Sequence, residues 1–181
     1  MIYAALTVLA ELLNAYLSNR FGATEDRVVL SNIVDQEGKV AIQETDKIIL
    51  TLINMEEEAV ISSGGRLGTA GGGFMNRPVN MNLFILFSAY FSRGNYEESL
   101  KFLSATISFF QANRFFDHQN TPDLDDNIEK MTCEIVNTDL QSLSHLWGVL
   151  GGKHMPSIMY KVRMVSFQEG NIESFFNRVG R

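Results

Sequence analysis

The hydrophobic pattern of the chain is strongest between Val79 and Asn113, where a strand pattern is followed at once by a helix pattern. From Val79 to Phe91 apolar residues occupy alternate positions, and Phe84 and Leu86 make the opposite face apolar as well. Strand side chains alternate between the two faces of a sheet. Because a strand that is apolar on both faces is usually covered on both sides, we expect this strand at the centre of the fold.

A long amphipathic helix is predicted directly after this strand, beyond the break at Arg93–Gly94. Asn95 is expected to cap the helix, with Glu98 at the third helical position as in a capping box. Apolar residues then recur at helical spacing and give the helix one wide stripe for the core. This stripe is predicted to consist of Tyr96, Leu100, Leu103, Ile107 and Phe110.

A first amphipathic helix is predicted from Ile2 to Arg20, ended by Phe21–Gly22. The start of the chain is apolar, but it lacks a basic leader and polar residues interrupt it on a helical period, which favours a helix of the folded domain over a signal peptide. No other run has the roughly 18 to 20 apolar residues of a membrane span. We therefore expect a soluble protein with no membrane partner. The predicted stripe is Ile2, Leu6, Leu9, Leu13, Tyr16 and Leu17.

The remaining pattern predicts strands within 28–33, 47–53 and 128–136, with a polar connection at 115–126. Asp139 is expected to cap a short helix that ends at Gly151–Gly152, and Pro156 to open a last strand. The resulting order, α-β-β-β-α-β-α-β, predicts an α+β fold with a mixed or antiparallel sheet covered by helices. No linker divides residues 1–181, so a single domain is expected, with one more helical turn within 171–181. The stripe of the short helix is Leu140, Leu143, Leu146, Trp147 and Leu150.

Residues 56–78 form a Gly-rich segment that offers few side chains for burial. Such a segment cannot offset the entropy lost when it is ordered, so we expect a long mobile loop. Long loops inside compact domains are often functional. The loop is therefore the first candidate for a partner surface.

Charge and cysteine usage narrow the classes of function. The net charge of -6, from 21 acidic and 15 basic residues, argues against a nucleic-acid surface. The single Cys133 cannot form an internal disulfide, which fits a reducing compartment or indifference to redox conditions. Since free cysteine is commonly buried and no base is evident nearby, Cys133 is interpreted as a small core residue.

Three further patterns are candidates for ligand sites. The Gly-rich segment could cradle a phosphate, but no Gly-Lys-Ser/Thr and no helix start follow it. Asp123–Asn127 with Glu134 resembles the acidic spacing of a calcium loop, yet Ile128 stands where that loop needs glycine. The three histidines, His118, His145 and His154, share no metal-ligand spacing, and Trp147 at helical spacing is interpreted as core. We expect no catalytic site, no cofactor and no metal.

The C-terminal segment carries two adjacent aromatic residues, Phe175 and Phe176, beside Arg178. Exposed aromatic residues with an arginine are enriched at protein interfaces. A partner contact and docking on the protein's own surface are both open for this segment.

Three stretches together resemble the N-terminal domain of the tail-terminator or cap proteins of phage-tail-like contractile injection systems. The first stretch is Met1–Leu13, and the second is the apolar strand Val79–Tyr90 with its helix through Phe110. The third has a Leu-x-x-Leu-Trp-x-x-Leu-Gly helix at 143–151, which leads to Pro-Ser-x-x-Tyr-x-apolar-Arg at 156–163. The likeness spans nearly the whole chain, and its motif positions are mostly packing residues.

The resemblance implies a structural protein rather than an enzyme. Such proteins assemble as a sixfold ring on the end of the inner tube, stop its polymerisation and anchor the last sheath ring. The implied partners are further copies of the chain, the tube protein, the sheath protein and possibly a further cap protein, with assembly in the cytoplasm before incorporation into the particle. Closed rings need two unlike patches on each subunit. We expect the Gly-rich segment and the C-terminal segment to supply them, through Arg66, Leu67, Phe74, Met75, Arg77, Phe175, Phe176 and Arg178.

The implied role leaves two questions open. The chain could be the terminal cap or an adaptor beneath another cap protein, because some relatives continue beyond this domain. From the residues alone, a small binding protein or enzyme that holds an anionic ligand with the Gly-rich segment is the alternative.

Overall fold

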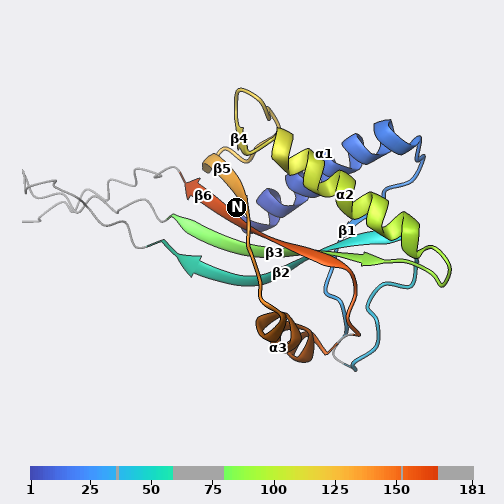
Figure 1. Ribbon diagram of the computed structural model, residues 1–181. Helices are drawn as coiled ribbons and strands as arrows, with labels where there is room; N and C mark the ends of the chain where they lie inside the picture. Colours follow the sequence, from blue (N-terminus) through green and yellow to red (C-terminus); the bar gives the residue numbers. More distant parts are fainter. Residues whose placement is uncertain (36, 59–79, 152, 167–181) are drawn as a thin grey trace, which may run out of the picture.

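The computed structural model describes residues 1–35, 37–58, 80–151 and 153–166 (Figure 1). Its elements follow the order α1, β1, β2, β3, α2, β4, β5, α3 and β6. The predicted order is confirmed except for one added strand, β4, which lies in the predicted polar connection. The bounds are α1 (Ile2–Phe21), β1 (Val28–Leu30), β2 (Lys47–Glu57), β3 (Met81–Tyr90), α2 (Tyr96–Ala112), β4 (Phe115–Asp117), β5 (Ile128–Ile135), α3 (Leu140–Leu150) and β6 (Ser157–Ser166).

The strands form one six-stranded sheet in the order β1-β2-β3-β6-β5-β4. β1 pairs with β2 in parallel, and every other neighbouring pair is antiparallel. Helices α1 and α2 cover one face of this curled sheet, and α3 lies on the other face (Figure 1). The predicted α+β class with a mixed sheet covered by helices is therefore confirmed.

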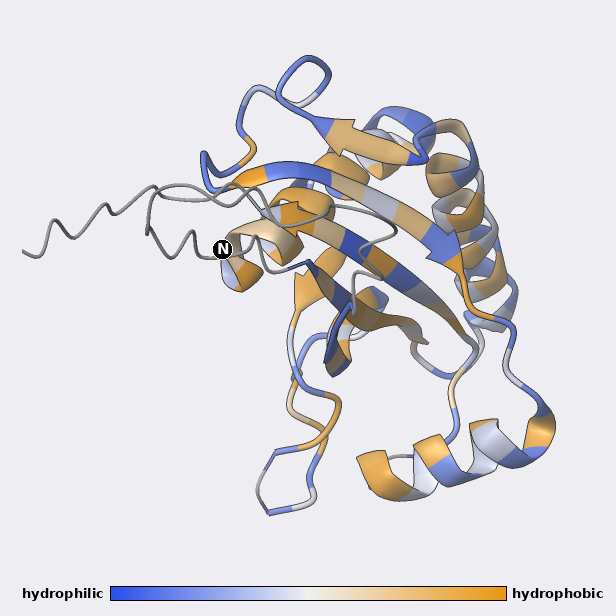
Figure 2. Cartoon of the chain, turned by 90° about the vertical axis from the view of Figure 1, so that its left-hand side faces the viewer, coloured by the Kyte–Doolittle hydropathy of each residue, from blue (hydrophilic) through white to orange (hydrophobic). Residues whose placement is uncertain are grey.

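Strand β3 lies inside the sheet, between β2 and β6, as its two apolar faces predict. On the side of α1 and α2, Ile85 and Phe87 are fully buried in the main core. On the side of α3, Leu86 packs with Trp147 and Ile33 in a second, smaller core. Figure 2 shows hydrophobic and hydrophilic residues interspersed along the strands. The expectation of a central strand is confirmed.

Helix α1 packs the predicted stripe on the core, with Leu9, Leu13 and Leu17 fully buried and Ile2 and Tyr16 partly buried. It ends at Gly22, whose φ of 66° lies in the left-handed region that favours glycine. The Gly22 N–H donates to the carbonyl oxygen of Ser18 at 2.8 Å. The predicted end of the helix is therefore correct.

Helix α2 buries Leu103 and Phe110 of the predicted stripe but exposes its first two residues. Tyr96 is 62% exposed and Leu100 is 40% exposed, whereas Ser99 and Thr106 are buried. Both hydroxyls donate to carbonyl oxygens within the helix, so their burial leaves no hydrogen bond unmade. Hydrophobicity alone misplaced this face because two polar residues lie in it. The buried residues of α2 are Ser99, Phe102, Leu103, Ala105, Thr106, Phe109 and Phe110.

The position of the α2 N-cap was correct, but the predicted capping bond was not. Asn95 precedes the helix and makes no side-chain cap hydrogen bond. Its amide instead donates to the Asp46 carboxylate at 3.2 Å and to the Ser92 hydroxyl at 3.0 Å. A tertiary contact with the start of β2 therefore replaces the local cap.

Helix α3 begins as predicted, because the Asp139 carboxylate accepts from the Ser142 N–H at 2.8 Å. It ends at Gly151 with a φ of 68°. Trp147 is the buried residue of this helix, as expected, and Leu140 is 85% exposed. The prediction that Leu140 belongs to the buried stripe was wrong, because only the residues near Trp147 pack on the sheet.

Two predictions fall outside the described residues, namely the loop at 56–78 beyond Glu58 and the helical turn within 171–181. Among the described helices, none combines the length and the hydropathy of a membrane span.

Candidate functional site

The residues predicted to make partner contacts all lie outside the described part of the chain: Arg66, Leu67, Phe74, Met75, Arg77, Phe175, Phe176 and Arg178. The residues that flank them are described and lie at one end of the sheet. Glu57, at the end of β2, is opposite Met81 at the start of β3. Met81 is in turn opposite Met164, near the end of β6. The Gly-rich segment and the C-terminal segment are therefore both attached at this end of the sheet, which we name the segment end.

An ion pair joins the two attachment points. The Arg163 guanidinium Nε lies 2.6 Å from Glu58 Oε2 and 2.9 Å from Oε1, across 105 residues of sequence. The Glu58 N–H also donates to the Asn80 carbonyl oxygen at 2.8 Å. Since Glu58 is 29% exposed and Arg163 is 45% exposed, the pair contributes at most about 1 kcal/mol to stability. Its main effect is to fix β6 against the residue that opens the Gly-rich segment.

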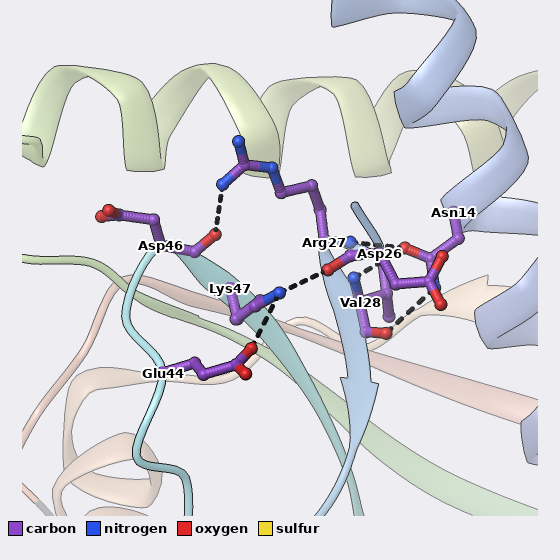
Figure 3. A network of polar contacts seen from close by, with 7 residues as sticks. All are labelled: Asn14, Asp26, Arg27, Val28, Glu44, Asp46 and Lys47. Atoms are coloured by element: carbon purple, nitrogen blue, oxygen red, sulfur yellow. Dashed lines mark hydrogen bonds and ion pairs between the residues drawn. The ribbon is translucent and has the colours of Figure 1, made fainter. Parts of the chain in front are cut away.

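The opposite end of the sheet is held by a network of polar contacts (Figure 3). Lys47 is only 6% exposed, and its ammonium donates to the Asp26 carbonyl oxygen at 2.7 Å and lies 3.1 Å from Glu44 Oε2. The Arg27 guanidinium donates to the Asp46 carbonyl oxygen at 3.2 Å. A buried ammonium is costly unless it is paired and hydrogen-bonded, so these contacts allow Lys47 to begin a core strand.

Asp46 connects this network to the turn between β3 and α2. It has a positive φ of 66°, which is uncommon for a residue other than glycine. Its carboxylate accepts from the Ser92 N–H at 3.0 Å and from the side chains of Ser92 and Asn95. The hydrogen bond from the Ser92 backbone is the largest cause that lowers the pKa of this carboxyl group. The contact favours the charged form and fixes the turn against β2.

Asparagine side chains bond to backbone groups of the two edge strands, β1 and β4. At the β1 edge, the Asn14 oxygen accepts from the N–H groups of Arg27 and Val28 at 2.8 and 2.7 Å, and its amide donates to the Val28 carbonyl oxygen at 3.0 Å. These bonds satisfy backbone N–H and carbonyl groups at the edge of β1 that could otherwise pair with another strand. The sequence signal for this role was the polar interruption of the α1 stripe, which we interpreted only as a helical period.

The β4 edge is closed in the same manner. The Asn120 oxygen accepts from the Asp117 N–H at 3.0 Å, and its amide donates to the Phe115 carbonyl oxygen at 3.1 Å. The predicted polar connection therefore contains both an edge strand and the side chain that closes it. Strand signals of three residues are too short to be recognised from hydrophobic alternation alone.

The candidate nucleophile is buried, as predicted. Cys133 is 5% exposed, and burial raises the pKa of its thiol to about 12. Burial also raises the pKa of the neighbouring Tyr160 hydroxyl to about 12. Both groups stay protonated at neutral pH, and a thiol reacts through its thiolate form. Cys133 is a core residue and has no reactive thiolate at neutral pH.

The acidic stretch before β5 is organised as a turn. The Asp125 carboxylate accepts from the Asn127 N–H at 2.9 Å and from its amide at 3.0 Å, and Ile128 then begins β5. Trp147 is buried, as predicted, and His145 is exposed. Within the described ranges, no cluster of three or more His, Cys, Asp or Glu side chains is placed to hold a metal ion.

An open cleft of about 730 Å³ lies where β3 ends, beside the start of α2 and the connection from α3 to β6. Basic side chains from two segments reach it, namely Arg93, Lys153 and His154. No Asp or Glu occurs among its described lining residues. The cleft therefore presents positive charge that could attract an anion.

Two solved structures share this fold. The chain is similar to the PVC sheath/tube terminator of an extracellular contractile injection system in its extended state, with a TM-score of 0.63 and 16% identity over 95% of this chain. It is also similar to the anti-feeding prophage cap, the AFP tube terminating cap, with a TM-score of 0.55 and 16% identity over 90% of this chain. It spans 58% and 54% of those two chains. Among curated proteins, none matches the sequence.

The family of the chain is shown by its sequence. A profile of the Pvc16 N-terminal domain matches residues 4–181. The chain belongs to the Pvc16 N-terminal domain family, which confirms the resemblance drawn from its three sequence stretches.

Proposed function

We propose that this chain is a structural component of a contractile injection system, which ends the inner tube as a ring-forming cap or cap adaptor and anchors the last sheath ring. The observation that carries this proposal is the family match over residues 4–181 together with the terminator fold. The matched structures are named as a sheath/tube terminator and as a tube terminating cap. Assembly in the cytoplasm and incorporation into the particle belong to the same proposal.

The role is structural rather than enzymatic. Support comes from the buried, protonated Cys133 and Tyr160. The partners are copies of the chain in a sixfold ring, the tube protein, the sheath protein and, for an adaptor, a further cap protein.

The segment end supplies contacts to these partners in our proposal. The Gly-rich segment contributes Arg66, Leu67, Phe74, Met75 and Arg77, and the C-terminal segment contributes Phe175, Phe176 and Arg178. The support is that β2, β3 and β6 attach both segments at the same end of the sheet, where Arg163 is paired with Glu58. Two segments attached side by side can contact one partner surface together.

The proposal is tested by imaging injection-system particles assembled with and without this protein. A terminator determines where polymerisation stops, so its absence should produce tubes of irregular length or particles whose sheath is detached at that end. Normal particles of normal length without the protein would refute the proposal.

A second experiment tests the Gly-rich segment and separates the rival function. Deletion of residues 64–73 should weaken ring assembly and tube capping, and unchanged assembly would refute the role of this segment. A thermal-shift screen against nucleotides and phosphorylated metabolites addresses the rival, because a ligand that binds only the folded state raises its apparent stability. A consistent shift of a monomeric protein would favour a binding protein for anionic ligands.

A further inference from the structure

The open cleft at the end of β3 carries positive charge that the described residues do not neutralise. Arg93 and Lys153 are exposed lining residues, and within the described part of the chain neither of them makes an ion pair. Glu97 and Glu98 follow in the first turn of α2 but do not line the cleft. The unpaired charges inside the cleft are therefore positive, and they can pair with carboxylates from outside.

The walls of the cleft are held by hydrogen bonds on two sides. The Ala89 N–H donates to the Pro156 carbonyl oxygen at 2.9 Å, which joins the end of β3 to the start of β6. The Asp46 carboxylate accepts from the Ser92 N–H at 3.0 Å and holds the turn before α2. A cleft that is already formed in the free protein binds a partner without the cost of ordering its walls.

The turn that leads from β4 into β5 carries the opposite charge. Asp123 and Asp126 are exposed, and neither makes an ion pair with another described residue. Asp125 lies between them and accepts from the Asn127 N–H at 2.9 Å, which fixes the shape of the turn. Pro122 is exposed as well. We name residues 122–126 the acidic turn.

The cleft and the acidic turn lie at opposite ends of β6 (Figure 1). Ser157, at the start of β6, is paired with Ser88 near the end of β3, beside the cleft. Ser166, at the end of β6, is paired with Ile128, which closely follows the acidic turn. The 10 residues of β6 separate the two patches by about 30 Å. One copy therefore cannot bring its own acidic turn into its own cleft.

We propose that the acidic turn of one copy of this chain docks in the cleft of the next copy. The carboxylates of Asp123 and Asp126 then pair with the cations of Arg93 and Lys153. Two unlike patches meet in this contact, so it is heterologous, and heterologous contacts generate a ring when the rotation between copies closes. The inference rests on the proposed ring-forming function and names the surfaces that join its subunits.

Apolar surface accompanies the charges on both patches. Tyr96, which is 62% exposed, and Phe91 line the cleft, and Pro122 is exposed in the acidic turn. A small inorganic anion would leave the apolar lining uncovered, whereas a turn that carries a proline covers part of it. Charge pairs that a contact encloses also interact more strongly than pairs in open water. These features favour a segment of protein as the occupant of the cleft.

Charge exchange tests the pairing. The cleft variant combines Arg93→Glu with Lys153→Glu. The turn variant combines Asp123→Lys with Asp126→Lys. Each variant alone should assemble about tenfold less than the wild type, both in concentrated solution and on tube ends, because like charges then meet. An equal mixture of the two variants should assemble again, because each cleft then meets a turn of opposite charge, and a chain with all four changes should do the same.

Two charge reversals outside both patches are the matched controls. Lys101→Glu and Glu11→Lys replace exposed residues on α2 and α1 and should leave assembly unchanged. Circular dichroism and thermal unfolding check that every variant is folded. Wild-type assembly of the cleft variant or of the turn variant would overturn the pairing. A loss in the cleft variant that neither the mixture nor the fourfold change restores would show that the cleft holds another occupant, which overturns the pairing as well.

Zero-length cross-linking tests the contact directly. A carbodiimide condenses the Lys153 amine with a carboxylate that touches it, and we expect mass spectrometry of the assembled protein to find Lys153 joined to Asp123 or Asp126. Because the two patches of one copy are about 30 Å apart, this product joins two copies. Lys153→Arg keeps the charge, so it should keep assembly and lose the product. Assembled protein without the product would contradict the contact.

The two proposals fail in different ways. Irregular particles without the protein, combined with no rescue by the charge exchange, would leave the terminator function standing and remove the contact between copies. Rescue and cross-linking between copies, combined with particles of normal length in the absence of the protein, would do the reverse.

Discussion

Removal of the Asn14 side chain is the most informative single change to the fold. Asn14 lies on α1, yet its three hydrogen bonds satisfy backbone groups of Arg27 and Val28 at the edge of β1. Asn14→Ala deletes all three bonds and leaves two N–H groups and one carbonyl oxygen without their partner. Because the site is only partly buried, water replaces some of the lost bonds but not all of them.

The expected loss follows from the bond count. A hydrogen bond contributes about 1 kcal/mol net, so the three bonds contribute about 3 kcal/mol. Alanine has the higher helix propensity by about 0.6 kcal/mol, which leaves a net loss of about 2.5 kcal/mol. For a chain of this length, that loss lowers Tm by roughly 5 to 10 °C.

Urea unfolding and thermal unfolding, both followed by circular dichroism, measure this loss. Asn19→Ala is the matched control, since Asn19 lies exposed on the same helix and carries the same propensity change. We expect the control to equal or slightly exceed the wild type. A free energy of unfolding for Asn14→Ala within about 0.5 kcal/mol of the control would show that the β1 edge does not depend on this side chain.

Three further outcomes are expected. Hydrogen bonds from Ser92 lower the pKa of Asp46. The contribution of this carboxylate to stability is therefore present above about pH 4 and is lost as pH falls through the lowered pKa. Urea midpoints should show that Asp46→Asn loses less stability than the wild type from about pH 5 to about pH 3. Cys133 should react with a thiol reagent at neutral pH only after denaturation, and fast labelling of the folded protein would contradict its burial. Phe87→Asp should abolish cooperative folding, and a folded, soluble variant would show that the core is misplaced.

The sequence predicted the elements whose packing faces are made of apolar residues. The α1 stripe and the two-sided β3 strand were correct because burial selects apolar side chains at those positions. The α2 stripe was correct at Leu103 and Phe110 but wrong in its first turn. Ser99 and Thr106 satisfy their hydroxyls within the helix, and a hydrophobic pattern does not register that possibility.

The candidate site was less predictable, because its contacts join residues that are distant in sequence. Arg163 could be placed on the polar face of its strand, but its partner Glu58 lies 105 residues away. Which strand edges stay open depends on strand order and on the lengths of β1 and β4, and neither follows from local pattern. The predicted contact residues at 66–77 and 175–178 stay predictions.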